Sequence, residues 1–303
     1  MLIWVGVTDK DWFDYLATIE PAEVNFWQPS PRPATRQLKP GDLFLFKLHS
    51  PDNFIVGGGF FVRFTTLPVK IVWETFEASA GVRTYSELLS RIGRYRRQPV
   101  RGDAEIGCNV LNAPFFFPRE DWIPIPPDWA PNIVRGKAYD TETDAGASLY
   151  EVVRANLQKN QFRDEITEEP AYDDPYLKRA RLGQGAFRVL VTDAYHRRCA
   201  VTGEKTLPVL EAAHIQPYAR SGPNRIENGL LLRADIHRLF DGGYVTVDPD
   251  LHFVVSDRVR EEYANGKEYY RYHGTKLLNL PEKVNEQPAR DFLDWHSSEI
   301  YVG

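Results

Sequence analysis

The chain has little cysteine and no long apolar run. Its 303 residues include two cysteines, Cys108 and Cys199, which lie far apart. Two thiols cannot build a disulfide scaffold or a four-cysteine zinc site, so we expect no structural zinc. No run of about 18 apolar residues exists, and the first residues lack the basic flank of a signal peptide. We therefore expect a cytoplasmic protein with no membrane partner.

An overall excess of positive charge is also missing. The formal net charge of −5 argues against a uniformly basic nucleic-acid binder. Residues 176–240 nevertheless hold 11 Lys or Arg against 5 Asp or Glu. Either a phosphate-facing surface or an ordinary solvated face would explain this local surplus. With 43% apolar residues, the chain is rich enough in core-forming residues for two domains.

The first half alternates apolar and polar residues in short runs. This pattern predicts strands over 2–7, 42–48, 54–64 and 69–73 and helices over 11–18 and 85–95. Several short strands with few helices favour a small β-barrel with helical decoration. An amphipathic helix over 149–162 and an acidic, proline-containing linker over 164–175 follow. Five arginines between 91 and 101 indicate either a phosphate contact or a solvated helix.

Residues 199–248 carry the densest pattern of chemically useful side chains. His214 lies in a predicted strand over 207–215, Asn228 opens a second short apolar run, and His237 lies in a predicted helix over 234–240. Helical spacing places His237 and Asp241 one turn apart on one face. If the helix crosses the strands, these side chains meet at one point. Phosphodiester hydrolysis needs such a site, with a base for water and a divalent ion for the phosphate.

The ordered blocks AAHI at 212–215, NGLLL at 228–232 and HRLFDGG at 237–243 resemble the HNH, or ββα-metal, nuclease motif. The resemblance implies that His214 is the general base and that Asn228 pins the loop that orients it. It also implies that His237 is a metal ligand, with Asp241 as a candidate second ligand. Taken singly, each of these residues could equally be structural, and Asp241 could simply end its helix.

One position departs from the family pattern. Many members carry Asp or His directly before the base and use it as a metal ligand, but this chain has Ala213. The ion would then depend on His237, Asp241 or Glu211, with phosphate oxygens and water completing its shell. Such a thin protein shell suits Mg²⁺, or Mn²⁺ in its place.

A strand-turn-strand segment in the first half is similar to the corresponding strands of PUA-like barrels, the superfamily that includes the EVE, ASCH, YTH and SRA modules. It consists of residues 38–46 and the glycine-rich run 55–61. The resemblance implies a modified-base reader, in which an unstacked base needs aromatic stacking and hydrogen bonds to its edge. The candidate pocket residues are Trp27, Asn25, His49 and Asn53. Tryptophan in a barrel can also be core, and both interpretations stay open.

Together these patterns predict an α+β protein. A PUA-like β-barrel with helices would span 1–140, a helix and acidic linker 141–175, and an HNH endonuclease domain with bracing helices 176–303. We expect a Mg²⁺-dependent endonuclease that cuts double-stranded DNA carrying a modified base, a modified cytosine first of all, as a homodimer. Phosphate contacts would come from Arg197, Arg198, Arg220 and Arg225. Two alternatives are a non-catalytic binder of modified nucleic acid and an HNH nuclease whose first domain binds RNA or protein.

Overall fold

The structure is a computed structural model that describes residues 1–34, 37–164 and 183–303. The chain divides into two compact units, Met1–Leu182 and Gly183–Gly303. Of the predicted acidic linker, the part from residue 165 onward lies outside the described residues. Over the described ranges, no helix combines the length and the apolar character that a membrane span requires.

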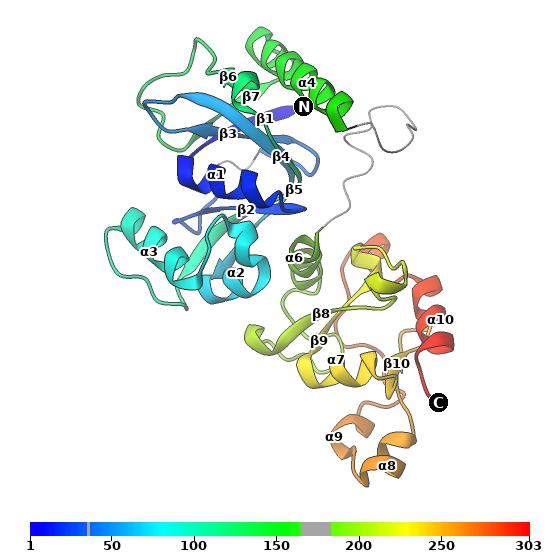
Figure 1. Ribbon diagram of the computed structural model, residues 1–303. Helices are drawn as coiled ribbons and strands as arrows, with labels where there is room; N and C mark the ends of the chain where they lie inside the picture. Colours follow the sequence, from blue (N-terminus) through cyan, green and yellow to red (C-terminus); the bar gives the residue numbers. More distant parts are fainter. Residues whose placement is uncertain (35–36, 165–182) are drawn as a thin grey trace. The chain divides into compact units, whose positions relative to one another are not determined.

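The first unit is built on one mixed sheet (Figure 1). The strands follow the order β2, β5, β4, β3, β1, β7, and the short β6 pairs with β4. β1 runs parallel to β3, and the other pairings of this sheet are antiparallel. The strands are β1 Leu2–Thr8, β2 Glu23–Gln28, β3 Leu43–Leu48, β4 Phe54–Pro68, β5 Glu105–Phe116, β6 Ile123–Pro124 and β7 Gly136–Asp140.

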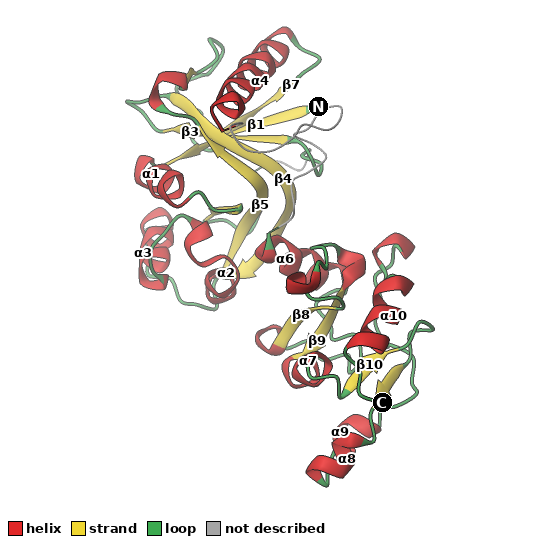
Figure 2. Ribbon diagram, turned by 45° about the vertical axis from the view of Figure 1, so that its right-hand side comes forward, coloured by secondary structure: helices red, strands yellow, loops and turns green. Residues whose placement is uncertain are grey.

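The α+β class is confirmed, but the sheet is not a closed barrel. Within the described residues, β2 and β7 are the two ends of the hydrogen-bonded order. Register shifts interrupt the pairing of β4 with β5 between Gly58 and Phe60 and again between Phe61 and Arg63. Such bulges bend the long strand and increase its twist. The result is a strongly curved open sheet (Figure 2).

The sheet is buried on both faces by helices. All six residues of β3 are buried, and alternate residues project to opposite faces. Leu43 and Leu45 join a core that includes Leu149 of α4 (Asp144–Asp164). Phe44 joins a second core that includes Trp12 of α1 (Lys10–Ile19). The sheet therefore lies between α1 and α4.

The predicted strand over 69–73 is wrong. These residues begin helix α2 (Val69–Phe76), which is followed by α3 (Tyr85–Arg96). The β-branched residues suggested a strand, but a five-residue run is too short to distinguish the two periods. Val69, Val72 and Phe76 are buried, and their spacing of three and four residues is helical.

The second unit surrounds a single apolar core. Helix α6 packs on an antiparallel pair, β8 and β9, which is followed directly by α7. A second antiparallel hairpin pairs β10 with β11. The elements are α6 Gln184–Ala194, β8 Leu210–His214, β9 Gly229–Arg233, α7 Ala234–Asp241, β10 Val245–Val247, β11 Phe253–Val255, α8 Arg258–Tyr263, α9 Lys267–Tyr270 and α10 Arg290–Glu299.

A neutral histidine is part of this core. His296 on α10 is 2% exposed and stacks on Phe240, with ring centroids 3.7 Å apart. The Nε2–H donates to the Phe240 carbonyl at 3.1 Å, and Nδ1 lies 2.9 Å from the Thr246 hydroxyl. Burial lowers the pKa of His296 from 6.5 to about 4, although the bond to Phe240 opposes this shift.

We expect the second unit to lose stability as the pH falls from 6.5 towards 4. In that window the unfolded chain binds a proton at His296 that the folded chain does not, so stability rises with pH. The loss should approach about 3 kcal/mol at the lower end. Hydrogen exchange of the β10 peptide at several pH values measures it. His296→Leu should be less stable at pH 7 and should show a flatter pH dependence; an unchanged slope would contradict the assignment.

Candidate active site

The pairing of β8 with β9 places His214 opposite Gly229. A Cβ atom at Gly229 would lie 2.5 Å from a methyl group of Val191 and 3.1 Å from the Phe187 ring, both on α6. Only glycine therefore lets α6 approach the strands so closely. This close approach brings the Phe187 ring onto His214.

His214 is held on its face and on its edge. Its ring stacks on Phe187 with centroids 3.9 Å apart and planes 11° from parallel. Its Nε2 lies 2.7 Å from Oδ1 of Asn224. Because an amide oxygen only accepts, this arrangement puts the proton on Nε2 and leaves the lone pair on Nδ1. Burial lowers the pKa of His214 below 6.5, against a smaller opposite effect of Asn224. The ring is therefore neutral at pH 7.

Asn228 ties down the loop between the two strands. Its side chain is fully buried. The Oδ1 atom accepts from the Gln216 amide at 2.9 Å, while Nδ2 donates to the carbonyls of Gln216 at 3.0 Å and Pro223 at 2.9 Å. Both ends of the loop are thus fixed to one side chain. Because Asn224 follows Pro223 directly, this anchoring also positions the partner of His214.

His237 on α7 lies between two carboxylates. Its Nδ1 is 2.7 Å from Oε2 of Glu211 on β8, and its Nε2 is 3.3 Å from Oδ2 of Asp241. Burial raises the pKa of Asp241, and Glu211 adds to the increase, whereas His237 and His214 oppose it. The predicted pair His237 and Asp241 is thus brought together, and Glu211 joins it from the strand. Ala213, by contrast, is fully buried in the core opposite Leu230.

The donor chemistry here fits a hard cation. Within the described ranges, no three His, Cys, Asp or Glu side chains are placed to hold an ion by themselves. The side chains of Glu211 and Asp241 are partly exposed, by 41% and 58%. Mg²⁺ takes one or two carboxylates and keeps several waters, and it gains phosphate oxygens from a substrate. The residues therefore suit such an ion.

The four arginines predicted to contact phosphate lie on the surface of the same unit. Arg197 approaches Asp193 at 3.7 Å, and Arg225 approaches Glu227 at 3.8 Å. Arg198 and Arg220 are exposed and have no ion-pair partner in the described part of the chain. Arg220 stands in the loop anchored by Asn228.

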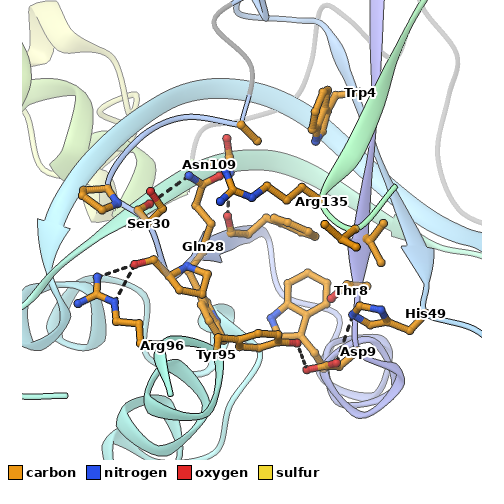
Figure 3. Close-up of a pocket in the computed structure, with 18 of the residues that line it drawn as sticks. Trp4, Thr8, Asp9, Gln28, Ser30, His49, Tyr95, Arg96, Asn109 and Arg135 are labelled. Carbon is orange, nitrogen blue, oxygen red and sulfur yellow. Dashed lines mark hydrogen bonds and ion pairs between the residues drawn. The ribbon is translucent and has the colours of Figure 1, made fainter. Parts of the chain in front are cut away.

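The first unit contains a cavity of about 930 Å³. Aromatic residues from several elements line it, among them Trp4, Trp27 and Tyr95. Of the predicted pocket residues, Trp27 and His49, the latter labelled in Figure 3, belong to the lining. The other two, Asn25 and Asn53, do not. Asn25 is fully buried in β2, and Asn53 accepts a hydrogen bond from Lys47 at 2.7 Å.

The five arginines between 91 and 101 are mostly engaged within the protein. Arg91 is paired with Glu87 and Asp11, and Arg94 with Asp9. The Arg96 guanidinium donates to the Pro29 carbonyl at 2.9 Å and also to the Glu105 carbonyl. These partners explain why the arginines cluster without implying a phosphate.

Several residues of both sites had not been predicted. At the cavity they are Asp9, Gln28, Tyr95 and Asn109, and at the nuclease-like site Phe187 and Asn224. For Asn109 a signal existed, because it is the polar residue of the otherwise apolar stretch 106–111 in β5. For Phe187 and Asn224 the spacing from His214 carries no regular period. They could be found only once the fold was known.

Residues 199–248 match the HNH endonuclease family, which confirms the predicted motif in this segment. Among solved structures, a mutant ASCH protein from Zymomonas mobilis is 9% identical with a TM-score of 0.32, covering 49% of this chain and 96% of that one. TagI, a modification-dependent restriction endonuclease, is 14% identical with a TM-score of 0.28, covering 92% and 75%. These scores are too low to support conclusions about function. No curated protein matches.

Proposed function

We propose, from the HNH match of residues 199–248, that this protein is a cation-dependent endonuclease that cuts double-stranded DNA carrying a modified base, with modified cytosine as the expected target. The observation that supports it is the neutral His214, clamped by Phe187 and Asn224, beside the His237 cluster with Glu211 and Asp241. A base next to a set of cation donors is what phosphodiester hydrolysis requires.

In the proposed reaction, His214 accepts a proton from water at its unprotonated ring nitrogen while the water oxygen attacks phosphorus and the bond from phosphorus to the leaving oxygen breaks. The lowered pKa keeps the ring ready to accept that proton at neutral pH. Phe187 and Asn224 fix the plane of the His214 ring, so the ring needs little reorientation to reach the transition state. A Mg²⁺ or Mn²⁺ ion that takes one or two ligands from His237, Asp241 or Glu211, with water and phosphate oxygens completing its shell, would neutralise charge on the phosphate and the leaving oxygen.

The aromatic cavity supports the proposal that the first unit recognises a base flipped out of the DNA helix. Trp27 has its indole nitrogen fixed to the Ala80 carbonyl at 2.9 Å, and Tyr95 lies edge-on to it with centroids 6.1 Å apart. A base outside the helix needs aromatic surface of this kind together with polar groups for its edge. Since each nuclease motif cuts one strand, we further propose that a homodimer cuts both.

The test is digestion of one plasmid prepared with and without cytosine methylation. We expect strand breaks in the modified plasmid with Mg²⁺ or Mn²⁺, and none after chelation. Equal cutting of both plasmids would contradict recognition of a modified base but would still be consistent with nuclease activity. A folded protein that binds modified DNA but never nicks it would favour a non-catalytic binder, for which the buried Ala213 is the one supporting observation.

A further inference from the structure

The floor of the cavity in the first unit is a sheet face that carries two side-chain amides. Phe26 on β2 pairs with Asn109 on β5, and Gln28 lies two residues further along β2. Residues two apart on a strand share a face, and so do residues directly opposite each other on paired strands. Phe26, Gln28 and Asn109 therefore project together, and all three line the cavity. Figure 3 labels the two amide residues, Gln28 and Asn109.

Both amides have their donor side engaged by the protein. Asn109, which is 6% exposed, donates from Nδ2 to the Phe26 carbonyl at 3.0 Å. Gln28 donates from Nε2 to the Ser30 carbonyl at 3.1 Å and also to that of Arg32. Within the described residues, no donor is bonded to Oδ1 of Asn109 or Oε1 of Gln28. Reversing either amide would place oxygen against a carbonyl, so each side chain is fixed as an acceptor.

A third acceptor lies at another part of the lining. The Asp9 carboxylate receives the Tyr95 hydroxyl at 2.7 Å and the Arg94 guanidinium at 3.2 Å, both on the same oxygen, Oδ2. Its other oxygen, Oδ1, lies 3.6 Å from Nε2 of His49. The cavity thus offers acceptors that are held in place, and a ligand that brings donors would satisfy them. A ligand that brings a carbonyl would leave them unpaired, which costs binding free energy.

The hydrogen-bond acceptors of the cavity would distinguish two bases of almost identical shape. Thymine carries a methyl group at C5 and a carbonyl oxygen at C4, whereas cytosine carries an amino group at C4. A methylated cytosine therefore differs from thymine mainly at that edge. A cavity that sensed only the methyl group would bind the thymine of any DNA. Discrimination requires acceptors placed at the amino position, and sites that hydrogen-bond a substrate group reject analogues without it strongly.

We propose that Gln28 and Asn109 are specificity-determining residues that accept N–H groups from the exocyclic amine of a flipped base. The cavity then takes amino-bearing bases, methylated cytosine among them, and excludes thymine. This inference rests on the proposed function, because it requires that a base enters the cavity. It goes beyond that function by naming the side chains that distinguish the base and the chemical group that they sense.

The experiment compares matched bases in one DNA sequence. Duplexes carry a single 5-methylcytosine, thymine, 5-hydroxymethylcytosine or 5-hydroxymethyluracil opposite an abasic position, so that no base has a pairing partner to lose. Binding is measured by fluorescence anisotropy with the full-length His214→Ala protein. We expect each cytosine form to bind at least about tenfold more tightly than its uracil counterpart, the equivalent of one hydrogen bond or more.

Variants connect this preference to the two amides. Asn109→Leu removes a buried acceptor, and Gln28→Leu removes the half-buried one, which a folded protein tolerates more easily. Each should bring the ratio of affinities close to one by weakening the cytosine forms. Asn132→Leu makes the same change at an exposed residue outside the lining and should keep the full ratio.

The outcomes separate this inference from the proposed function. Equal binding of the matched bases, combined with a preference for modified over unmodified DNA, would overturn the role of the amides and keep the reader. Binding that falls equally for all four duplexes in both leucine variants would also overturn it, since that is the mark of a structural role. Absence of any base-dependent binding would overturn the reader and the inference together.

Discussion

Replacing His214 by alanine should abolish strand cleavage while DNA binding is retained. His214 is the neutral imidazole of the site, and no other described histidine is stacked and bonded next to the His237 cluster. Loss of a positioned general base typically lowers the rate by about 10²–10⁴-fold. Plasmid nicking under single-turnover conditions measures the chemical step, and a gel-shift with the same modified duplex measures binding.

His252→Ala is the matched control for this prediction. His252 lies in the same unit, where its Nδ1 is 3.2 Å from the Asp248 carboxylate, away from the candidate site. Its replacement should leave the cleavage rate within about twofold, the range expected of a surface substitution. If His214→Ala cleaves at the wild-type rate, or if both variants lose activity to the same extent, His214 is not the base.

The sequence was most informative where chemistry and spacing coincide. Three ordered blocks were enough to predict a strand over 207–215 that carries His214, a helix with His237 and Asp241 on one face, and the role of Asn228 as a loop anchor. In the structure His214 stands at the end of β8, and His237 lies 3.3 Å from Asp241 on α7; the chemical roles of these side chains stay predictions. A strand has period two and a helix period 3.6, so residues inside one element can be placed from the chain alone.

Contacts between elements could not be predicted in this way. Phe187 reaches His214 because Gly229 lets α6 approach the strands, and nothing in the local pattern of α6 marks that ring. The acceptor character of Gln28 and Asn109 depends on which backbone carbonyls their nitrogens meet, and this follows only from strand register. Asn25 illustrates the reverse, since it has the expected residue type but lies fully buried outside the cavity lining.

Ala213 has a physical explanation once the register is known. It faces the core opposite Leu230 and is fully buried. A carboxylate at this position would lose its hydration without gaining a hydrogen-bond or ion-pair partner. Glu211, two residues earlier, instead reaches Nδ1 of His237 at 2.7 Å. A carboxylate is thus present at the site from the same strand, at a different position. Because Glu211 provides the carboxylate that position 213 lacks, an active nuclease is favoured over a degenerate one.

Replacing Asn228 by alanine should impair both stability and cleavage. The change removes three hydrogen bonds and leaves the Gln216 amide and the carbonyls of Gln216 and Pro223 without this partner. Unpaired buried groups cost about 1–3 kcal/mol each, so a loss of about 3 kcal/mol is a conservative expectation. Cleavage should fall about 100-fold, because small misplacement of a catalytic group has effects of that size.

Two measurements separate these effects, and a control variant calibrates them. Hydrogen exchange of the β8 and β9 peptides reports local stability, and single-turnover nicking at a temperature where the variant is fully folded reports His214 positioning. Asn279→Ala removes a single bond, from Nδ2 to the Cys199 carbonyl at 2.9 Å, and should cost about 1 kcal/mol without slowing cleavage. If folded Asn228→Ala cleaves like the control, the loop anchor serves only the fold, and Asn224 must be held at His214 by other contacts.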